Sequence, residues 1–348
     1  MKRFYTLISC AIFGFFIGCI LYLLPNSTIG HTCAPTIYDT GMNEDITTST
    51  KDTKYKINPY TGEPLQNFDE NTIPFLCIID NSRNARPQSG LSEADIVYES
   101  TIEYGIPKFL ALFYKNSPIK IGPIVNAYHC FVDISKEYEI PFAHCGGSED
   151  VLSTISSDTS IHNINELSQG QYFWRDTSRM SPNNLYTSSS KLKNYLKSTY
   201  SPITPNCALT FNNLTWLDNS LEKVTELNLN LSSYYNTSYK FINGVYEKYM
   251  DGILATDLND NTPLSFNNIV IQITNISSNL SNESSTINLI GSGEGLIFSN
   301  GKVQKMHWIK SNESSPTILT NSNGEILSLN PGKTIWHLAD ITTKISYK

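Results

Sequence analysis

The stretch that decides the fold is "ADIVYESTIEYGIPKFLALFYK", residues 94–115, in which two β-prone segments flank the turn signal Tyr104-Gly105-Ile106-Pro107. Two such segments around a short glycine-containing turn predict a β-hairpin. Because side chains alternate between the two faces of a strand, the first segment has two different faces. One face carries Asp95, Val97, Glu99, Thr101 and Glu103, and the other carries Ile96, Tyr98, Ser100 and Ile102. We expect the first face to be acidic and the second to belong to the core.

Further strands and helices are predicted on both sides of this hairpin. The apolar run "IPFLCIID" (73–80) is typical of a buried strand, and "IKIGPIVNAY" (119–128) predicts a strand with a bulge or edge at Gly122-Pro123. Helices are predicted over "SEDVLSTISS" (148–157) and "SSSKLKNYLKSTY" (188–200). Hairpin strands with interspersed helices predict an α+β fold, here a mixed-sheet α/β sandwich domain over residues 57–230.

The sequence after about Asn236 has a different pattern. Alternating segments such as "YKFINGVYEKYMDG" (239–252) and "NNIVIQITNI" (267–276) are separated by Asn-Gly, Ser-Gly and Pro-Gly turns. Alternation with turns at regular spacing is typical of antiparallel strands. We therefore expect residues 231–348 to form a smaller, β-rich C-terminal domain.

The start of the chain predicts a membrane attachment. Residues 4–24 are apolar apart from one threonine and one serine, and they follow Lys2 and Arg3. At ~1.5 Å per residue a helix of that length spans roughly 30 Å, about one hydrocarbon core. The length favours an uncleaved single-pass helix over residues 1–25, and Cys19 after Gly18 leaves a lipoprotein signal as the alternative. Residues 26–56 lack periodicity and predict a disordered stalk. Because Lys2 and Arg3 should stay in the cytoplasm, the bulk of the chain is expected outside it.

Charge and cysteine content exclude several functional classes. The net charge is −7 and the basic residues are scattered, which argues against nucleic acid as a partner. The cysteines outside residues 1–25 show neither a C-x-x-C motif nor the spacing of a zinc site. We expect them to be buried thiols, and we expect no metal and no cofactor.

Several motifs together resemble one bacterial family. "NPYTGEPL", "IDNSRNARPQSGLSEADIVYE", "KFLALFYKNSPIKIGPI", "HCGGS", "FWRDTSRMSPNNLYT" and "LNPGKTIWHLAD" follow one another from about Asn58 to the end of the chain. They are similar to the YerB-like family of bacterial envelope proteins, many of which are described as lipoproteins. The resemblance implies an N-terminal and a smaller C-terminal domain, both of unknown function.

The chain departs from the family pattern at two places. Val125 and Tyr128 stand where the family commonly has arginines, and Asn183 stands where it has a histidine between proline and asparagine. If those groups bind an anion or move protons in the relatives, the resemblance implies that this chain has weakened or lost that property.

The first candidate site surrounds the start of the hairpin. Its polar residues are Asp80, Asn81, Arg86, Gln88, Ser89, Asp95, Glu99 and Glu103. Arg86 beside carboxylates can clamp a polar ligand in a groove. The alternative, which we favour, is a strand face on which Arg86 holds the loop through a salt bridge.

Two further candidates lie later in the chain. His144 precedes Cys145 and two glycines at a predicted strand end, and it is either a general base or a hydrogen-bonded structural histidine. The second is a polar loop that follows Tyr172, Phe173 and Trp174 and contains Arg175, Asp176, Arg179, Asn183, Asn184 and Tyr186. Aromatic rings beside guanidinium and amide groups are typical of carbohydrate or peptide grooves, although Trp174 can equally belong to the core.

Three functional hypotheses follow. The leading one is a non-catalytic, membrane-anchored extracytoplasmic protein that binds a cell-envelope component, either peptidoglycan or an envelope protein. The second is a hydrolase or transferase of an envelope polymer, with His144 and either Glu99 or Glu103 as acid and base. The third is a structural subunit of an envelope or sporulation assembly.

Overall fold

The computed structural model describes residues 56–66, 68–69, 71–201, 206–278 and 285–348. The predicted anchor and the predicted stalk, apart from Lys56, lie outside this range. Over the described ranges, the structure contains no helix with the length and apolarity needed to cross a membrane.

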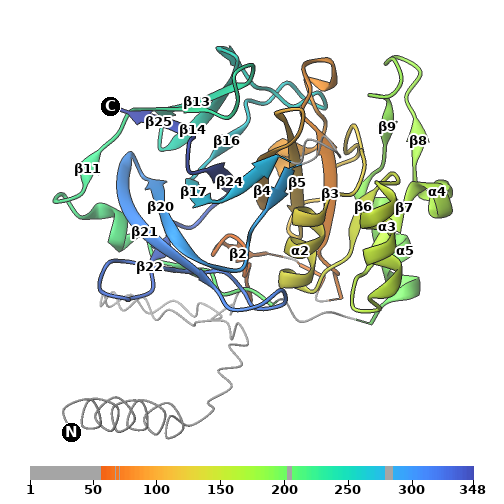
Figure 1. The fold of residues 1–348 in the computed structure, drawn as a ribbon, viewed down its shortest axis with the longest axis horizontal. Coiled ribbons are helices and arrows are strands. Elements are labelled where there is room, and N and C mark those ends of the chain that lie inside the picture. The colour runs from red at the N-terminus through yellow and green to blue at the C-terminus, as the bar shows by residue number, and fades with distance from the viewer. Residues whose placement is uncertain (1–55, 67, 70, 202–205, 279–284) are drawn as a thin grey trace, which may run out of the picture. The chain divides into compact units, whose positions relative to one another are not determined.

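A large mixed sheet forms the centre of the fold (Figure 1). Its order along the main path is β11 (Glu222–Lys223), β21 (Lys302–Lys310), β20 (Gly291–Ser299), β17 (Asn268–Thr274), β24 (Thr334–Asp340), β4 (Ile96–Glu103), β5 (Ile106–Phe113), β3 (Phe75–Asp80), β6 (Phe142–His144) and β7 (Asn163–Asn165), with β22 (Ile318–Thr320) beside β21. The predicted hairpin is confirmed, because β4 and β5 pair antiparallel with Ile96 opposite Leu112. The α+β prediction is confirmed as well.

The strand β24 joins the two halves of the sequence. It runs parallel to both neighbours, with Trp336 opposite Val270 of β17 on one side and Tyr98 of β4 on the other. A strand with a partner on each edge and cover on each face is buried along its length, as the run "TIWHLA" is here. The main sheet thus takes strands from both predicted domains, and the boundary between them stays a prediction.

A second, antiparallel sheet covers one face of the main sheet. It contains β15 (Ile253–Leu254), β14 (Val245–Met250), β13 (Asn236–Ile242), β12 (Glu226–Asn230), β25 (Lys344–Tyr347) and β16 (Ser265–Phe266). The predicted Asn-Gly turn is confirmed between β13 and β14, where Asn243 and Gly244 have φ of 50° and 86°. Positive φ at both central residues suits the right-handed twist of a hairpin.

This cover corrects the prediction of an acidic strand face on one side and a core face on the other. Val97 and Phe109 pack in one hydrophobic cluster with Leu229 and Tyr239 of the second sheet, and Glu99 is only 1% exposed. Both faces of β4 are therefore buried. Alternation assigns side chains to faces, but only the tertiary structure decides what covers each face.

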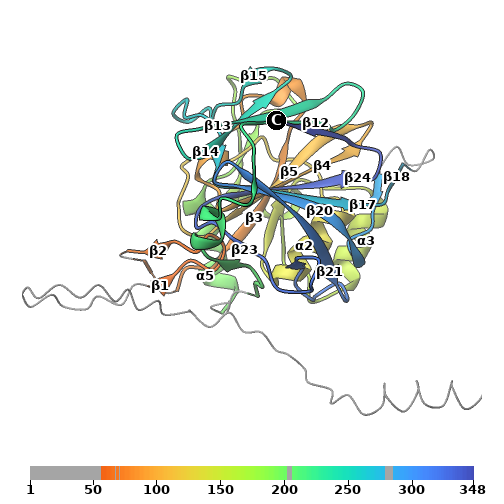
Figure 2. The ribbon, with the colours of Figure 1, turned by 90° about the vertical axis from the view of Figure 1, so that its left-hand side faces the viewer.

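Helices cover the opposite face (Figure 2). Phe131 of α2 (His129–Tyr138) and Val151 of α3 (Glu149–Ser157) belong to the cluster that contains Tyr98 and Leu110. The predicted helix over residues 148–157 is α3, and the Ser148 side chain caps its start by accepting a hydrogen bond from the Val151 N–H. Remaining short elements are β1 (Lys56–Ile57), β2 (Pro64–Leu65), β10 (Thr210–Phe211), β23 (Ser328–Leu329), β18 (Ile276–Ser278), β19 (Ser285–Ile287), α4 (Glu166–Gln169) and the 3₁₀ turns η1 (Arg83–Ala85), η2 (Leu91–Glu93), η3 (Gly170–Tyr172) and η4 (Leu214–Leu217).

The segment 119–128 and a hairpin with its following helix lie at the β3 end of the main sheet. The predicted second helix is α5 (Ser189–Thr199), which follows a short hairpin of β8 (Trp174–Arg175) and β9 (Leu185–Tyr186). The predicted strand over residues 119–128 is wrong, since this segment makes only isolated bridges, such as Ile121 with Thr187. Gly122 has a φ of 145° and lies too close to the Leu185 carbonyl for any side chain, and Pro123 has no N–H to donate to a ladder.

Candidate functional site

A buried ion pair between the two sheets contains the first of the candidate carboxylates. Glu99 of β4 accepts hydrogen bonds from Lys248 Nζ at 2.6 Å and from Asn81 Nδ2 at 2.7 Å. Lys248 of β14 is fully buried, and its ammonium also donates to Thr237 Oγ1 at 2.5 Å and to Tyr239 Oη at 3.0 Å. Its three N–H groups therefore meet three acceptors. Such saturation is what a buried charge needs in order to be tolerated.

The same contacts assign the tautomer of His337. Because the Tyr239 hydroxyl accepts from Lys248, its own proton is directed to His337 Nε2, 2.8 Å away. His337 then carries its proton on Nδ1, which lies 3.4 Å from Glu99 Oε2. Burial, and next the nearby charge of Lys248, hold the pKa of His337 well below its ordinary value. The imidazole is therefore neutral in the folded protein.

Sequence reasoning missed Lys248, Tyr239 and His337, although a signal was present for one of them. In β14 the alternate residues Tyr246, Lys248 and Met250 are buried. A lysine at the inward position of an alternating strand predicts a buried charge that needs a partner. His337 lies inside an apolar run and gives no comparable signal.

Arg86 fastens the loop after β3. Its guanidinium donates to Asn81 Oδ1 and to the Asn81 carbonyl, both at 3.1 Å, and to Asp251 Oδ2 at 2.8 Å. Arg83 reaches the same Asp251 oxygen at 3.0 Å, and both guanidinium groups lie over the ring of Tyr235. Arg86 therefore connects this loop to the β14–β15 turn rather than to an open groove.

The remaining members of the first cluster divide into separate contacts. Lys108 Nζ donates to Asp80 Oδ1 at 2.6 Å, and Gln88 Nε2 donates to the Asp80 carbonyl at 3.0 Å. Ser89, like Gln88, is fully buried. Glu103 is half-buried and accepts a hydrogen bond from the Tyr128 hydroxyl at 3.0 Å.

Asp95 belongs to a different place in the fold. Its carboxylate accepts from Asn58 Nδ2 and from the Tyr114 N–H, both at 2.7 Å. Burial raises the pKa of Asp95 to about 6, while these hydrogen bonds act in the opposite direction. Asp95 thus holds the entry loop against the end of β5.

His144 is buried and has partners on both ring nitrogens. Nδ1 lies 2.8 Å from the Gly146 carbonyl, and Nε2 lies 3.3 Å from Asn163 Oδ1. Burial lowers the pKa of His144. Among the hydrogen bonds and ion pairs of the described residues, none joins His144 to Glu99 or Glu103. The acid and base of the hydrolase hypothesis are therefore not linked to each other.

The polar loop between β8 and β9 does meet the first cluster. Arg179 donates to the Pro87 carbonyl at 2.8 Å and to the Asn84 carbonyl at 2.9 Å. At the base of the hairpin Arg175 donates to Asn184 Oδ1 at 3.1 Å, while Asn183 is half-exposed. Two of the three candidate clusters thus converge on the loop 83–90, and the His144 cluster stays apart.

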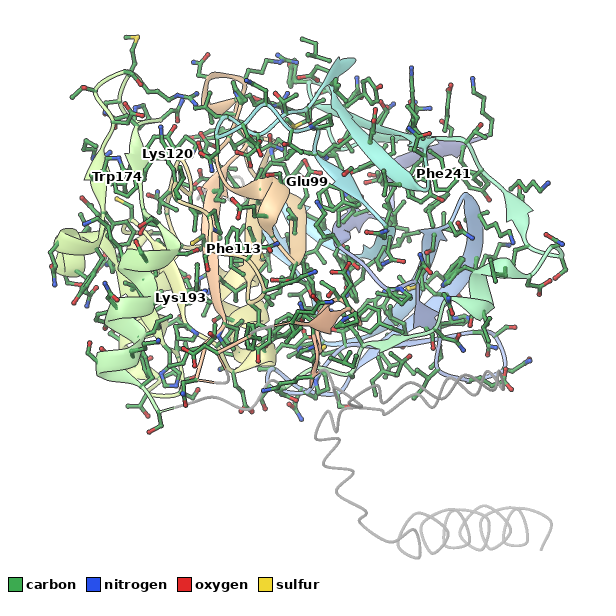
Figure 3. All side chains as sticks on the ribbon, turned by 180° about the vertical axis from the view of Figure 1, so that it is seen from behind. Glu99, Phe113, Lys120, Trp174, Lys193 and Phe241 are labelled. Carbon is green, nitrogen blue, oxygen red and sulfur yellow. The ribbon has the colours of Figure 1, made fainter. Side chains whose placement is uncertain are left out.

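Asp176 and Tyr186, at the base of this hairpin, both contact the ammonium group of Lys120. Lys120 forms an ion pair with Asp176, and its ammonium lies 4.1 Å from the centre of the Tyr186 ring. Lys120 and Trp174 are labelled near each other in Figure 3, at the same end of the molecule. This cation fastens the hairpin to the segment that precedes Ile121.

These contacts unite several turns into one surface, which we call the loop face. It comprises residues 83–85, 104–105, 176–183, 232–235 and 251–253. Arg83 donates to the Tyr234 carbonyl, and Gly105 lies against Ser232. The side chains of Tyr104, Met180, Tyr234 and Ile253 are exposed on this surface.

The described residues contain no group of side chains that could hold a metal ion. Within the described residues, no three His, Cys, Asp or Glu side chains gather at a distance that suits one ion. The described cysteines Cys77, Cys130 and Cys145 form no disulfide with one another.

Comparison with known proteins identifies the family. Two family models match the chain, "Protein of unknown function (DUF3048) N-terminal domain" over residues 60–201 and the corresponding C-terminal domain over residues 225–336. "Putative lipoprotein YerB" of Bacillus subtilis (strain 168) is 29% identical over 301 residues, which cover 81% of this chain and 86% of that protein. The crystal structure of YerB from Bacillus subtilis matches with a TM-score of 0.74 at 26% identity, covering 83% of this chain and 99% of that one. The chain therefore belongs to the YerB-like family of DUF3048 proteins, as its motifs had indicated.

Proposed function

We propose that this protein is held at the outer side of the cell membrane and binds a cell-envelope polymer, without catalysing a reaction on it. The observation that carries the proposal is the contrast between two sets of groups. Glu99 and His144 are buried and have partners within the protein, whereas the loop face presents aromatic and polar side chains to solvent. General acid–base catalysis needs its groups within reach of a substrate.

The loop face has the chemistry of a glycan-binding surface. Tyr104 and Tyr234 are 65% and 69% exposed, and an exposed ring offers an apolar face on which a sugar can stack. Arg83 and Asn183 add hydrogen-bonding groups that remain partly exposed. Peptidoglycan offers both sugar rings and polar peptide groups, and it is the polymer that this combination favours.

Membrane attachment is supported by the description of the relative as a lipoprotein and by Cys19 after Gly18 in this chain. Figure 2 shows β1 and β2, where the described chain begins, at the lower left and β15 at the top, on the opposite side of the fold. A stalk that joins the body at β1 would leave the loop face directed away from its point of attachment. That orientation suits a protein whose partner is the cell wall.

Retention on insoluble peptidoglycan tests the proposal. The full chain, solubilised in a mild non-ionic detergent, is incubated with purified sacculi and sedimented. We expect retention of the native protein, and a loss of about tenfold in affinity for Tyr104→Ala combined with Tyr234→Ala, since stacking contacts are worth roughly 0.5–1.5 kcal/mol each. Ile341→Ala is the matched control, because Ile341 is exposed but lies outside the loop face.

Two outcomes would overturn the proposal. The first is absence of retention of the native chain. The second is release of cleaved or transferred muropeptides by the native chain that stops in His144→Ala or Glu99→Gln, because that result would make the protein an enzyme.

A further inference from the structure

A basic cavity lies beside α5, away from the loop face. It has a volume of about 320 Å³, and its polar lining consists of Ser117, Ser190, Lys193, Asn194 and Lys197. Figure 3 labels Lys193 on this part of the surface. Cavities of about 300 Å³ and above are of the size that holds small ligands or parts of larger ones.

Helix periodicity explains why these side chains gather. Ser190, Lys193, Asn194 and Lys197 are spaced i, i+3, i+4 and i+7, so they follow one another along a single face of α5. Leu192 and Leu196 bury the opposite face of the helix. The segment 117–119 forms the other wall of the cavity.

The cavity carries positive charge without a balancing acid on its helix. α5 contains three lysines and neither Asp nor Glu. Lys193 Nζ makes one hydrogen bond, to Ser117 Oγ at 2.7 Å, and no ion pair with any described residue. Burial lowers the pKa of Lys193, and Lys197 adds to this effect, while the charges of Asp95 and Asp69 oppose it. A half-buried ammonium with unused donors is stabilised by an anion.

Lys197 can turn towards the same anion at small cost. Its ammonium lies 3.1 Å from Asp69 Oδ2, and both side chains in that pair are about half-exposed. Exposed ion pairs contribute roughly 0–1 kcal/mol, so exchanging this partner for a ligand costs little.

We propose that this cavity binds a phosphoryl group. Two ammonium groups, a serine hydroxyl and an asparagine amide offer donors from several directions, which suits the tetrahedral oxygens of phosphate. A planar carboxylate is matched better by the fork of an arginine, and no arginine lines this cavity. The proposal does not rest on peptidoglycan binding by the loop face.

Calorimetric titration of the full chain in non-ionic detergent tests this site. The probes are inorganic phosphate, glycerol 3-phosphate and bis(glycerol) phosphate, with acetate as the comparison anion. We expect saturable binding of phosphate, weakened about tenfold or more in Lys193→Gln, because that change removes a charge-assisted hydrogen bond. Binding of the diester would point to a phosphodiester polymer, and binding of the monoester alone to a small phosphate ester.

Lys191→Gln is the matched control. It removes the same charge from the same helix, but Lys191 Nζ donates to the Gln171 carbonyl and does not line the cavity. We expect Lys191→Gln to change phosphate affinity by less than about twofold. Equal weakening in both variants, acetate binding as tight as phosphate binding, or no saturation at about 50 mM phosphate would each overturn the proposal.

Discussion

Replacing Lys248 by methionine is the sharpest test of how this fold is held together. Both side chains of the Lys248–Glu99 pair are buried, and Lys248 Nζ lies 2.6 Å from Glu99 Oε2. At an effective dielectric constant of about 20, two unit charges at that separation attract by roughly 6 kcal/mol, which offsets much of the cost of removing both from water. In Lys248→Met, Glu99 loses that attraction but remains buried. We expect the free energy of unfolding to fall by about 3–5 kcal/mol.

Urea unfolding of the full chain in non-ionic detergent, followed by tryptophan fluorescence, measures this loss. Lys348→Ala is the control, because Lys348 pairs with Glu226 on the surface and such a pair is worth roughly 0–1 kcal/mol. Glu99→Leu combined with Lys248→Met removes both charges and should restore at least about 2 kcal/mol relative to Lys248→Met alone. A loss of less than about 1 kcal/mol in Lys248→Met, or no recovery in the double variant, would refute this account of the pair.

Two further predictions concern pH and packing. Burial lowers the pKa of both His337 and His144, so the unfolded chain binds more protons than the folded one below about pH 6.5, and stability should fall as the pH drops from 7 towards 6. Urea midpoints measured across this range should show a flatter slope in His337→Gln than in the native chain. An unchanged slope would contradict this prediction. Below about pH 6 Asp95 acts in the opposite direction, because its raised pKa favours the folded state there. Gly295→Ala should lower the thermal midpoint and the free energy of unfolding, the latter by about 1–3 kcal/mol, because a Cβ there would lie 2.3 Å from the Ile271 carbonyl. In the control Gly170→Ala the added Cβ meets no atom within 4 Å, so the thermal midpoint should change by no more than about 1 °C.

The sequence predicted the local elements of this fold well. The turn signal at residues 104–107 and the Asn243-Gly244 dipeptide each set a hairpin, and Ser148 set the start of a helix. These features depend on backbone preferences within a few residues. Failure at residues 119–128 also has a local cause, since Gly122 and Pro123 interrupt an otherwise strand-like apolar pattern.

The long-range arrangement was not predictable in the same way. Lys248 and Glu99 are 149 positions apart, and neither residue's neighbours indicate that a second sheet covers β4. The eight polar residues grouped by proximity in the sequence separate in space, because Asp95 binds the Tyr114 N–H while Glu99 faces Lys248. Arg179 was grouped with the β8–β9 loop, and its contact with the Asn84 carbonyl brings the two loops together. The four polar residues of α5 that line the basic cavity, by contrast, can be recognised in the sequence by their helical spacing.

The position of β24 sets the order in which this protein can be completed. Residues 334–340 lie between β17 and β4, yet they follow both strands in the sequence and are synthesised after them. Until they emerge, β4 and β17 each keep an open edge, and the central hydrogen-bond ladder cannot close. In the nascent polypeptide the strands on either side of β24 can therefore pair first, and the sheet becomes continuous only when this late strand is inserted between them.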